Sequence, residues 1–206
     1  MITILDYGLG NIKAFEQVFK NIGRNAKIVS NSEDLKKATK IVLPGVGSFD
    51  WAMKKLNDSG LKETLNELVI EKKIDILGVC VGMQMMARKS EEGNLPGLGW
   101  VDAEVKKINT LKCEKKLFLP HMGWNEVTII NKKSRLFKGF DNPLFYFLHS
   151  YYIFPNCESN VAAYSSYAHN FPVSIEFENI FGTQFHPEKS HGWGENLLKN
   201  FVGKNA

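Results

Sequence analysis

The sequence has few cysteines and no long hydrophobic run. Only Cys80, Cys113 and Cys157 occur among 206 residues, and three cysteines at wide, unrelated spacings fit neither a disulfide framework nor a zinc site. No apolar stretch approaches the roughly 18 to 20 residues that a membrane helix requires, and the N-terminus lacks the basic flank and long apolar core of a signal peptide. These absences predict a cytoplasmic protein in a reducing compartment, with no bound metal and no membrane association.

Charge of one sign is not in excess either. The 26 Lys and Arg residues against 22 Asp and Glu residues give a net charge of +4, and many of the lysines form scattered pairs without a sustained basic block. Neither a phosphate-binding G-x-x-x-x-G-K-[ST] loop nor a dinucleotide fingerprint is present. We therefore predict no nucleic-acid partner and no cofactor.

The first half of the chain alternates strand-like and helix-like patterns. With 206 residues and 44% hydrophobic content, the chain is long enough for one sizeable core, and we predict a single domain over residues 1–206. Alternating strands and helices imply right-handed crossovers and a parallel sheet. The expected elements are strands at 2–5, 26–29, 41–43 and 74–79 and helices at 12–22, 34–38, 49–56, 61–72 and 82–88.

The second half is richer in strands. The expected strands lie at 101–108, 126–130, 144–148, 161–164, 173–177 and 180–185, and a helix at 194–202 closes the chain. The predicted fold class is α/β, with a doubly wound, mostly parallel central sheet flanked by helices and an antiparallel extension in the second half. Ligands of such sheets gather at the carboxyl ends of the strands.

A cysteine stands where a buried strand turns sharply into a helix, in Gly78-Val79-Cys80-Val81-Gly82. This spacing is typical of a nucleophile elbow, because the glycines two residues before and after the central residue leave room for a strained turn that exposes it. The start of a helix also favours the thiolate form. The sequence predicts a catalytic Cys80; the alternative for this motif alone is a buried core cysteine.

The segment Gln184-Phe185-His186-Pro187-Glu188 offers a base for that thiol. His186 and Glu188 are two residues apart, so on an extended segment their side chains lie on the same side, and the carboxylate can orient the imidazole. We predict a triad of Cys80, His186 and Glu188. Taken alone, a His-x-Glu at a strand end is more often an ordinary surface pair.

The chain resembles the class I (triad) glutamine amidotransferases, and within them most closely the glutaminase subunits of imidazole glycerol phosphate synthases. The matching segments span nearly the whole chain: residues 6–11 (DYGLGN), 44–49 (PGVGSF), 78–84 (GVCVGMQ), 120–125 (PHMGWN), 145–152 (FYFLHSYY) and 184–190 (QFHPEKS). The resemblance implies that Cys80 attacks the side-chain amide of glutamine, that ammonia leaves, and that water hydrolyses the resulting thioester to glutamate. His186 would act as general acid and base, with Glu188 orienting it.

The resemblance also assigns the groups around the substrate. Backbone N–H groups of Val46, Gly47 and Val81 would form the oxyanion hole, and Gly45 and Gly47 would let their loop rotate an amide toward the substrate. An ordinary Pro-Gly turn is the alternative reading of that loop. Expected substrate contacts are Gln84, one helical turn after Cys80, and the segment His149, Ser150 and Tyr151; a helix-surface glutamine and an aromatic core strand are the alternatives.

Nothing in the sequence would activate an acceptor for the released ammonia, so a partner is expected. By resemblance it is a (β/α)8-barrel synthase subunit forming a heterodimer and making imidazole glycerol phosphate and an aminoimidazole carboxamide ribotide in histidine biosynthesis. Trp124 and Tyr146 are candidate interface residues, unless they fill the core.

Three departures from the family pattern leave the acceptor open. Val81 stands where leucine is common, and residues 12–15 and 190–194 are less typical of the histidine-pathway subunit. A related subunit that supplies ammonia to another synthase, such as one modifying surface sugars, is therefore an alternative. A stand-alone cysteine hydrolase and a catalytically silent regulatory subunit are two others.

Overall fold

The computed structural model describes residues 1–110 and 117–203, so Cys113 lies outside the described residues. Its centre is an eight-stranded sheet in the order β2-β1-β3-β4-β13-β12-β11-β8. The first five strands in this order are parallel to one another. The remaining neighbours, β13 with β12, β12 with β11 and β11 with β8, pair in antiparallel fashion. This confirms the predicted fold class, including the antiparallel extension. The strands are β1 (Ile2–Leu5), β2 (Ala26–Val29), β3 (Lys40–Gly45), β4 (Asp75–Cys80), β8 (Thr128–Ile129), β11 (Val161–Ser166), β12 (Asn170–Phe177) and β13 (Ile180–Thr183).

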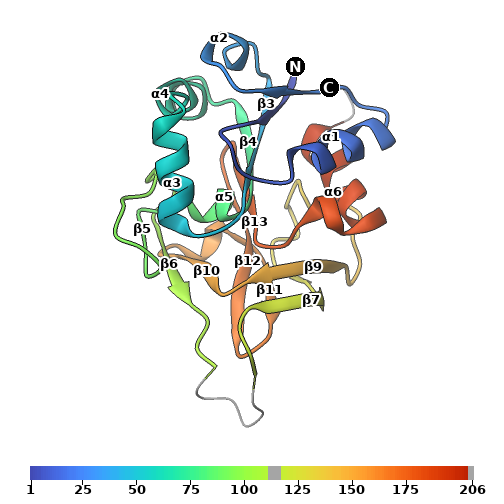
Figure 1. Ribbon diagram of the computed structural model, residues 1–206. Coiled ribbons are helices and arrows are strands. Elements are labelled where there is room, and N and C mark those ends of the chain that lie inside the picture. Colours follow the sequence, from blue (N-terminus) through green and yellow to red (C-terminus); the bar gives the residue numbers. More distant parts are fainter. Residues whose placement is uncertain (111–116, 204–206) are drawn as a thin grey trace.

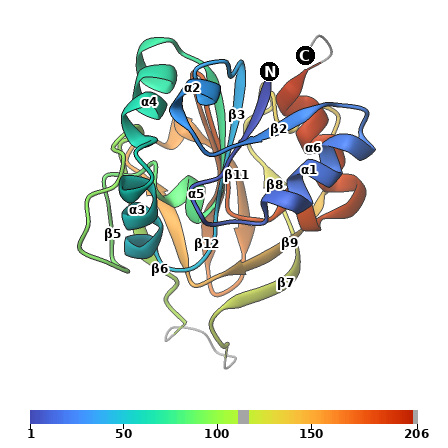
Figure 2. The same ribbon diagram turned by 45° about the horizontal axis from the view of Figure 1, so that its top comes forward.

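Helices cover both faces of the parallel part of the sheet (Figures 1 and 2). Helices α3 (Phe49–Asp58) and α4 (Lys62–Asn66) lie on one face, and α1 (Ile12–Asn21) and α6 (His191–Val202) lie on the other. Apolar stripes explain this arrangement, since each helix buries one side against the sheet. Fully buried examples are Phe15 and Phe19 in α1, Leu56 in α3 and Leu198 in α6. None of the helices in the described ranges is long and apolar enough to cross a membrane.

Two smaller sheets lie beside the large one. One has the order β10-β6-β5, with β10 at Tyr151–Pro155, β6 at Ala103–Lys107 and β5 at Lys89–Ser90. The other pairs β7 (His121–Glu126) with β9 (Leu144–His149) in antiparallel register, and both ribbons lie side by side below α6 in Figure 1. The predicted strand at 126–130 thus belongs to two elements, β7 and β8.

Several element boundaries differ from the prediction. The helix expected at 82–88 is only α5 (Val81–Gln84). The carbonyls of Met85, Met86 and Ala87 accept hydrogen bonds from residues 98, 101 and 99 of a returning loop, so the chain leaves the helix. The helix expected at 61–72 begins as α4 and continues as a π-helical segment, η1 (Glu67–Glu71). The helix expected at 34–38 is α2 (Ser32–Leu35), because the Asn31 side chain caps it by accepting the N–H of Asp34 at 2.9 Å.

Candidate active site

Cys80 ends strand β4 and begins α5 in a strained backbone conformation. Its φ of 56° and ψ of −115° lie in a region that few non-glycine residues adopt. The glycines on either side have no room for a side chain. A Cβ at Gly78 would lie 2.8 Å from the Gly82 carbonyl oxygen, and a Cβ at Gly82 would lie 3.0 Å from the carbonyl carbon of Leu43. The geometry is that of a nucleophile elbow, as the glycine spacing predicts.

The Cys80 sulfur has polar neighbours on two sides. Its Sγ lies 3.8 Å from the carbonyl oxygen of Leu148. The side-chain amide of Gln184 donates to the sulfur from Nε2 at 3.6 Å. The sulfur is thus placed between a carbonyl acceptor and an amide donor.

His186 and Glu188 form a buried pair beside Cys80. Nδ1 of His186 lies 2.8 Å from Oε1 of Glu188, and the two side chains are 4% and 1% exposed. They do not lie on an extended segment as expected, because Pro187 begins the 3₁₀ turn η3 (Pro187–Lys189), and this turn brings the carboxylate back to the ring. Asn11 Nδ2 donates to the same Oε1 at 2.9 Å. The pair is thus oriented from two separate parts of the chain.

The environment of His186 favours its protonated form. Burial alone would lower the pKa of the imidazole, but interaction with the Cys80 sulfur and with the Glu188 carboxylate outweighs burial and raises the pKa of His186 to about 10. Tyr7 lies beneath the same site and donates its hydroxyl to the Pro44 carbonyl at 2.7 Å. Burial, and then the negative charge of Cys80, raise the pKa of Tyr7, so its hydroxyl stays a donor.

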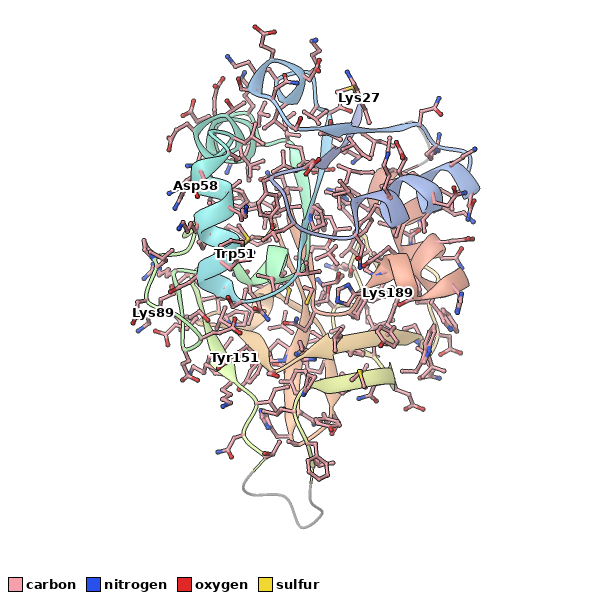
Figure 3. All side chains as sticks on the ribbon, viewed as in Figure 1. Lys27, Trp51, Asp58, Lys89, Tyr151 and Lys189 are labelled. Atoms are coloured by element: carbon pink, nitrogen blue, oxygen red, sulfur yellow. The ribbon has the colours of Figure 1, made fainter. Side chains whose placement is uncertain are left out.

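A cavity of about 340 Å³ opens over these residues. Tyr151 and Lys189, both labelled in Figure 3, line it together with the cysteine and the histidine. Its volume lies near the lower end of the usual range for small-molecule sites, which suits a ligand the size of an amino acid. The cavity is lined by Asn11, Val46, Gly47, Cys80, Val81, Gln84, Glu92, Leu148, His149, Ser150, Tyr151, His186 and Lys189.

Most of the residues singled out from sequence therefore meet at one cavity, but Gly45 and Glu188 do not line it, and Glu188 contacts His186 instead. A Cβ at Gly45 would meet the backbone of Val81 and Gly82. Gly45 therefore allows β3 to pack closely against the start of α5. Gly47 has a φ of 85°, which suits the turn that follows Gly45.

Gln84 and His149 use their polar atoms within the protein. Gln84 is 2% exposed, and its Nε2 donates to the Tyr151 carbonyl at 2.8 Å and to Oε1 of Gln184 at 3.0 Å. The two ring nitrogens of His149 are engaged by Tyr151 and His121. Direct side-chain contact of Gln84 and His149 with a substrate stays a prediction; in this structure both support the cavity wall.

Trp124 and Tyr146 do not fill the core. They lie opposite each other in the β7-β9 register, and Trp124 is 47% exposed. Met122, Leu144 and Leu148 share this outward side, and each is exposed. We call Met122, Trp124, Leu144, Tyr146 and Leu148 the β7-β9 outer face.

Sequence reasoning missed four polar side chains of this site, and one of them, Lys189, lines the cavity. Asn11 and Gln184 lie inside the family-like segments, yet only the folded chain shows that they contact Glu188 and Cys80. Glu92 had no signal of its own. It lines the cavity while accepting the N–H of Phe49, the first residue of α3, at 2.8 Å. Burial raises the pKa of Glu92. The hydrogen bond from the Phe49 N–H lowers this pKa, and the negative charge of Asp50 raises it further.

No cluster of three or more metal-ligating side chains occurs in residues 1–110 and 117–203. The ionisable groups that line the cavity include a thiol, two imidazoles, one carboxylate and a lysine. This set is suited to nucleophilic acyl chemistry with proton transfer through the imidazole.

Comparisons with known proteins agree with the geometry. The profile of the family Glutamine amidotransferase class-I matches residues 3–205. A protein of Leptospira interrogans named imidazole glycerol phosphate synthase subunit HisH is 51% identical over 202 residues, covering 98% of this chain and 99% of that protein. The subunit of the same name from Bdellovibrio bacteriovorus is 46% identical, with 98% of each chain covered.

Solved structures share the fold at lower identity. A crystal structure described as a glutamine amidotransferase has a TM-score of 0.72 at 20% identity, covering 98% of this chain and 96% of that chain. The structure of PurLQS from Thermotoga maritima has a TM-score of 0.73 at 15% identity, with the same coverage. The family profile matches nearly the full length of the chain, and a full-length relative is 51% identical to it. The chain therefore belongs to the class I glutamine amidotransferase family.

Proposed function

We propose that this protein is the glutaminase subunit of an imidazole glycerol phosphate synthase. It hydrolyses glutamine to glutamate and ammonia and passes the ammonia to a synthase subunit with a (β/α)8-barrel fold. The observation that carries the proposal is that Cys80 and His186 line one amino-acid-sized cavity, with Glu188 paired to His186. The names of the full-length relatives support the choice of synthase.

Cys80 is the proposed nucleophile. Its thiolate adds to the side-chain carbonyl carbon of glutamine, and the C–N bond breaks as protonated His186 gives its proton to the leaving nitrogen. Ammonia and a glutamyl thioester result. The raised pKa of His186 suits this step, because the ring is charged at neutral pH before the attack.

His186 then acts in the opposite direction. The neutral ring takes a proton from water, the hydroxide adds to the thioester carbonyl, and the C–S bond breaks to give glutamate and the thiolate. Glu188 stabilises the imidazolium and fixes which ring nitrogen faces the cysteine, since its carboxylate occupies Nδ1. Asn11 holds that carboxylate in place.

Negative charge on the carbonyl oxygen needs fixed donors. We assign this role to the backbone N–H groups of Val46, Gly47 and Val81, whose residues line the cavity together with Cys80. Loss of one such donor typically costs about 100- to 1,000-fold in turnover. The Tyr7 hydroxyl holds the Pro44 carbonyl at the start of that loop, and so limits where the loop can move.

The charged groups of glutamine itself need complementary partners. Glu92 is placed to accept hydrogen bonds from the α-ammonium group, since it is the carboxylate of the cavity wall that the triad does not use. The segment His149, Ser150 and Tyr151 and the Gln84 amide form the wall for the α-carboxylate and the amide chain.

The β7-β9 outer face is the proposed docking surface for the synthase. Its apolar side chains are exposed, and Leu148 belongs both to this face and to the cavity lining. A partner seated there would cover the mouth of the cavity. Ammonia would then pass directly into the partner and not into water. In water at neutral pH, ammonia is mostly protonated and no longer nucleophilic. Lyase chemistry on the partner's substrate would belong to the partner.

A glutaminase assay tests the proposal. Glutamate release is expected to be slow for the protein alone, to rise at least tenfold with the barrel synthase and its ligand, and to be lost in Cys80→Ala. Unchanged turnover in Cys80→Ala refutes the nucleophile.

The same assay separates the alternative partners. Stimulation by a surface-sugar synthase from the same cell, and not by the barrel synthase, would reassign the acceptor while leaving the glutaminase intact. Full activity without any added protein would instead indicate a stand-alone cysteine hydrolase.

A further inference from the structure

A chain of hydrogen bonds runs from strand β7 to the wall of the cavity. His121 and His149 are opposite each other in the β7-β9 register, and Nδ1 of His121 lies 3.0 Å from Nε2 of His149. Nδ1 of His149 lies 2.9 Å from the carbonyl oxygen of Tyr151. At the other end, Nδ2 of Asn125 lies 3.2 Å from Nε2 of His121. Both rings are buried, at 3% and 6% exposed.

The position of each proton in this chain follows from its cavity end. A backbone carbonyl only accepts, so His149 must carry its proton on Nδ1. A neutral ring then has a lone pair on Nε2, and His121 must donate to it from its own Nδ1. This leaves a lone pair on Nε2 of His121, which accepts from the Asn125 amide.

The β7 end requires the same arrangement independently. The Asn125 amide is oriented by two backbone contacts, because Nδ2 donates to the Ser166 carbonyl at 2.8 Å and Oδ1 accepts the N–H of Glu126 at 2.8 Å. Its second N–H therefore faces His121. Both ends of the chain thus specify one tautomer for each ring.

The surroundings keep both rings neutral and fixed. Burial lowers the pKa of His121 to about 4. Burial also lowers the pKa of His149 to about 3, a shift that the Tyr151 carbonyl opposes and the neighbouring histidines increase. The His121 ring stacks on Phe147 at 4.7 Å and on Tyr167 at 4.3 Å between centroids, which holds its plane.

We propose that His121 and His149 form a positioning relay that ties the Ser150–Tyr151 wall of the glutamine cavity to strand β7 and so sets the affinity for glutamine. The inference rests on the proposed glutaminase function. The relay reaches the reacting sulfur in two further steps: Gln84 donates to the same Tyr151 carbonyl and to Gln184, and Gln184 donates to Cys80. Met122, next to His121, belongs to the outer face.

Two variants of His121 form a matched pair for the test. Gln places an acceptor oxygen near the position of Nε2, so His121→Gln keeps a partner for Asn125 and loses the donor to His149. Asn places an N–H near the position of Nδ1, so His121→Asn keeps the donor to His149 and loses the contact with Asn125.

Steady-state glutaminase kinetics are measured on the complex with the stimulating synthase. For His121→Gln we expect a KM for glutamine raised about tenfold, equivalent to about 1.4 kcal/mol, with kcat within about twofold of the wild type. For His121→Asn we expect a KM within about threefold. Equal effects of the two variants, an unchanged KM in His121→Gln, or a loss confined to kcat would overturn the relay.

A measurement on the unaltered protein guards against variants that fail to fold. Nitrogen-15 NMR of the imidazole rings at pH 7 is expected to show His121 and His149 with Nδ1 protonated and Nε2 bare. A charged ring or an Nε2–H tautomer at either position refutes the relay. If Cys80→Ala abolishes activity while both His121 variants keep a normal KM for glutamine, the relay is refuted and the glutaminase function stands. Activity that survives in Cys80→Ala refutes the proposed function instead.

Discussion

The close contact between Gly82 and strand β3 gives a sharp prediction for Gly82→Ala. The added Cβ would lie 3.0 Å from the Leu43 carbonyl carbon and 3.2 Å from that of Pro44, and closer still to the Leu43 oxygen. These are backbone atoms of a strand that is paired with β4 at both positions, so they cannot turn away. Relief requires the start of α5 to separate from β3, which moves Cys80 relative to the proposed oxyanion loop.

The expected cost has two parts. Overpacking of this kind typically lowers the free energy of unfolding by about 1–3 kcal/mol. A displacement of about 1 Å at a reacting group can lower turnover about 100-fold. Urea unfolding and the glutaminase assay with the stimulating synthase measure the two parts separately.

Gly192→Ala is the matched control. Apart from the adjacent residues and the backbone of its own helix, no atom lies within 4 Å of the Cβ that it would add, and Gly192 lies in the first turn of α6. Its unfolding free energy is expected to be unchanged or raised by up to about 1 kcal/mol. Wild-type stability and turnover in Gly82→Ala would refute the description of the elbow as a close-packed backbone contact.

Three further predictions concern the triad and the outer face. Glu188→Gln keeps the shape of the side chain and removes its charge, so glutaminase turnover measured with the synthase is expected to fall by about two to four orders of magnitude; a fall of less than threefold would contradict the role of Glu188 in stabilising the imidazolium. Because the folded-state pKa of His186, about 10, exceeds the value of about 6.5 for an unfolded chain, its protonation stabilises the fold fully below pH 6.5 and progressively less as the pH rises through 10. The free energy of unfolding should thus fall more steeply between pH 7 and pH 10 in the wild type than in His186→Asn, and parallel curves would contradict this. Trp124→Ala is expected to raise the Kd for the synthase about 30-fold, or about 2 kcal/mol. Phe154 is an exposed aromatic residue on β10, and Phe154→Ala is expected to have little effect in the same titration. Equal Kd values for the two variants would place the docking surface elsewhere.

The parallel half of the sheet and the elbow could be predicted because their signals are local. Buried strands read as short apolar runs, and the glycines around Cys80 reflect atoms within a few residues or at the end of β3. The His186–Glu188 pair could also be predicted, although the 3₁₀ turn at Pro187, and not an extended segment, brings the two side chains together.

Strand β7 could not be predicted, because its pattern is inverted. Its inward residues His121, Gly123 and Asn125 are polar or small, whereas Met122 and Trp124 point outward. An outer face that is apolar apart from Glu126 has no explanation within the part of the chain that the structure describes. It is consistent with a strand whose second face is covered by a partner.

The length of α5 and the polar neighbours of the triad depend on contacts between distant segments. The carbonyls of residues 85–87 are taken by a loop more than ten residues away. Asn11 reaches Glu188 across 177 positions, and Gln184 reaches Cys80 across 104. Local periodicity carries no information about such pairings, so only the folded chain shows them.

The most direct measurement of the central claim is the site of covalent labelling by a diazoketone analogue of glutamine. The complex is treated with the analogue, digested and mapped by mass spectrometry, with and without excess glutamine. We predict one label, on Cys80, appearing in step with the loss of glutaminase activity and prevented by glutamine. Inactivation with the label on Cys157 or Cys113, or with Cys80 unmodified, would contradict the account.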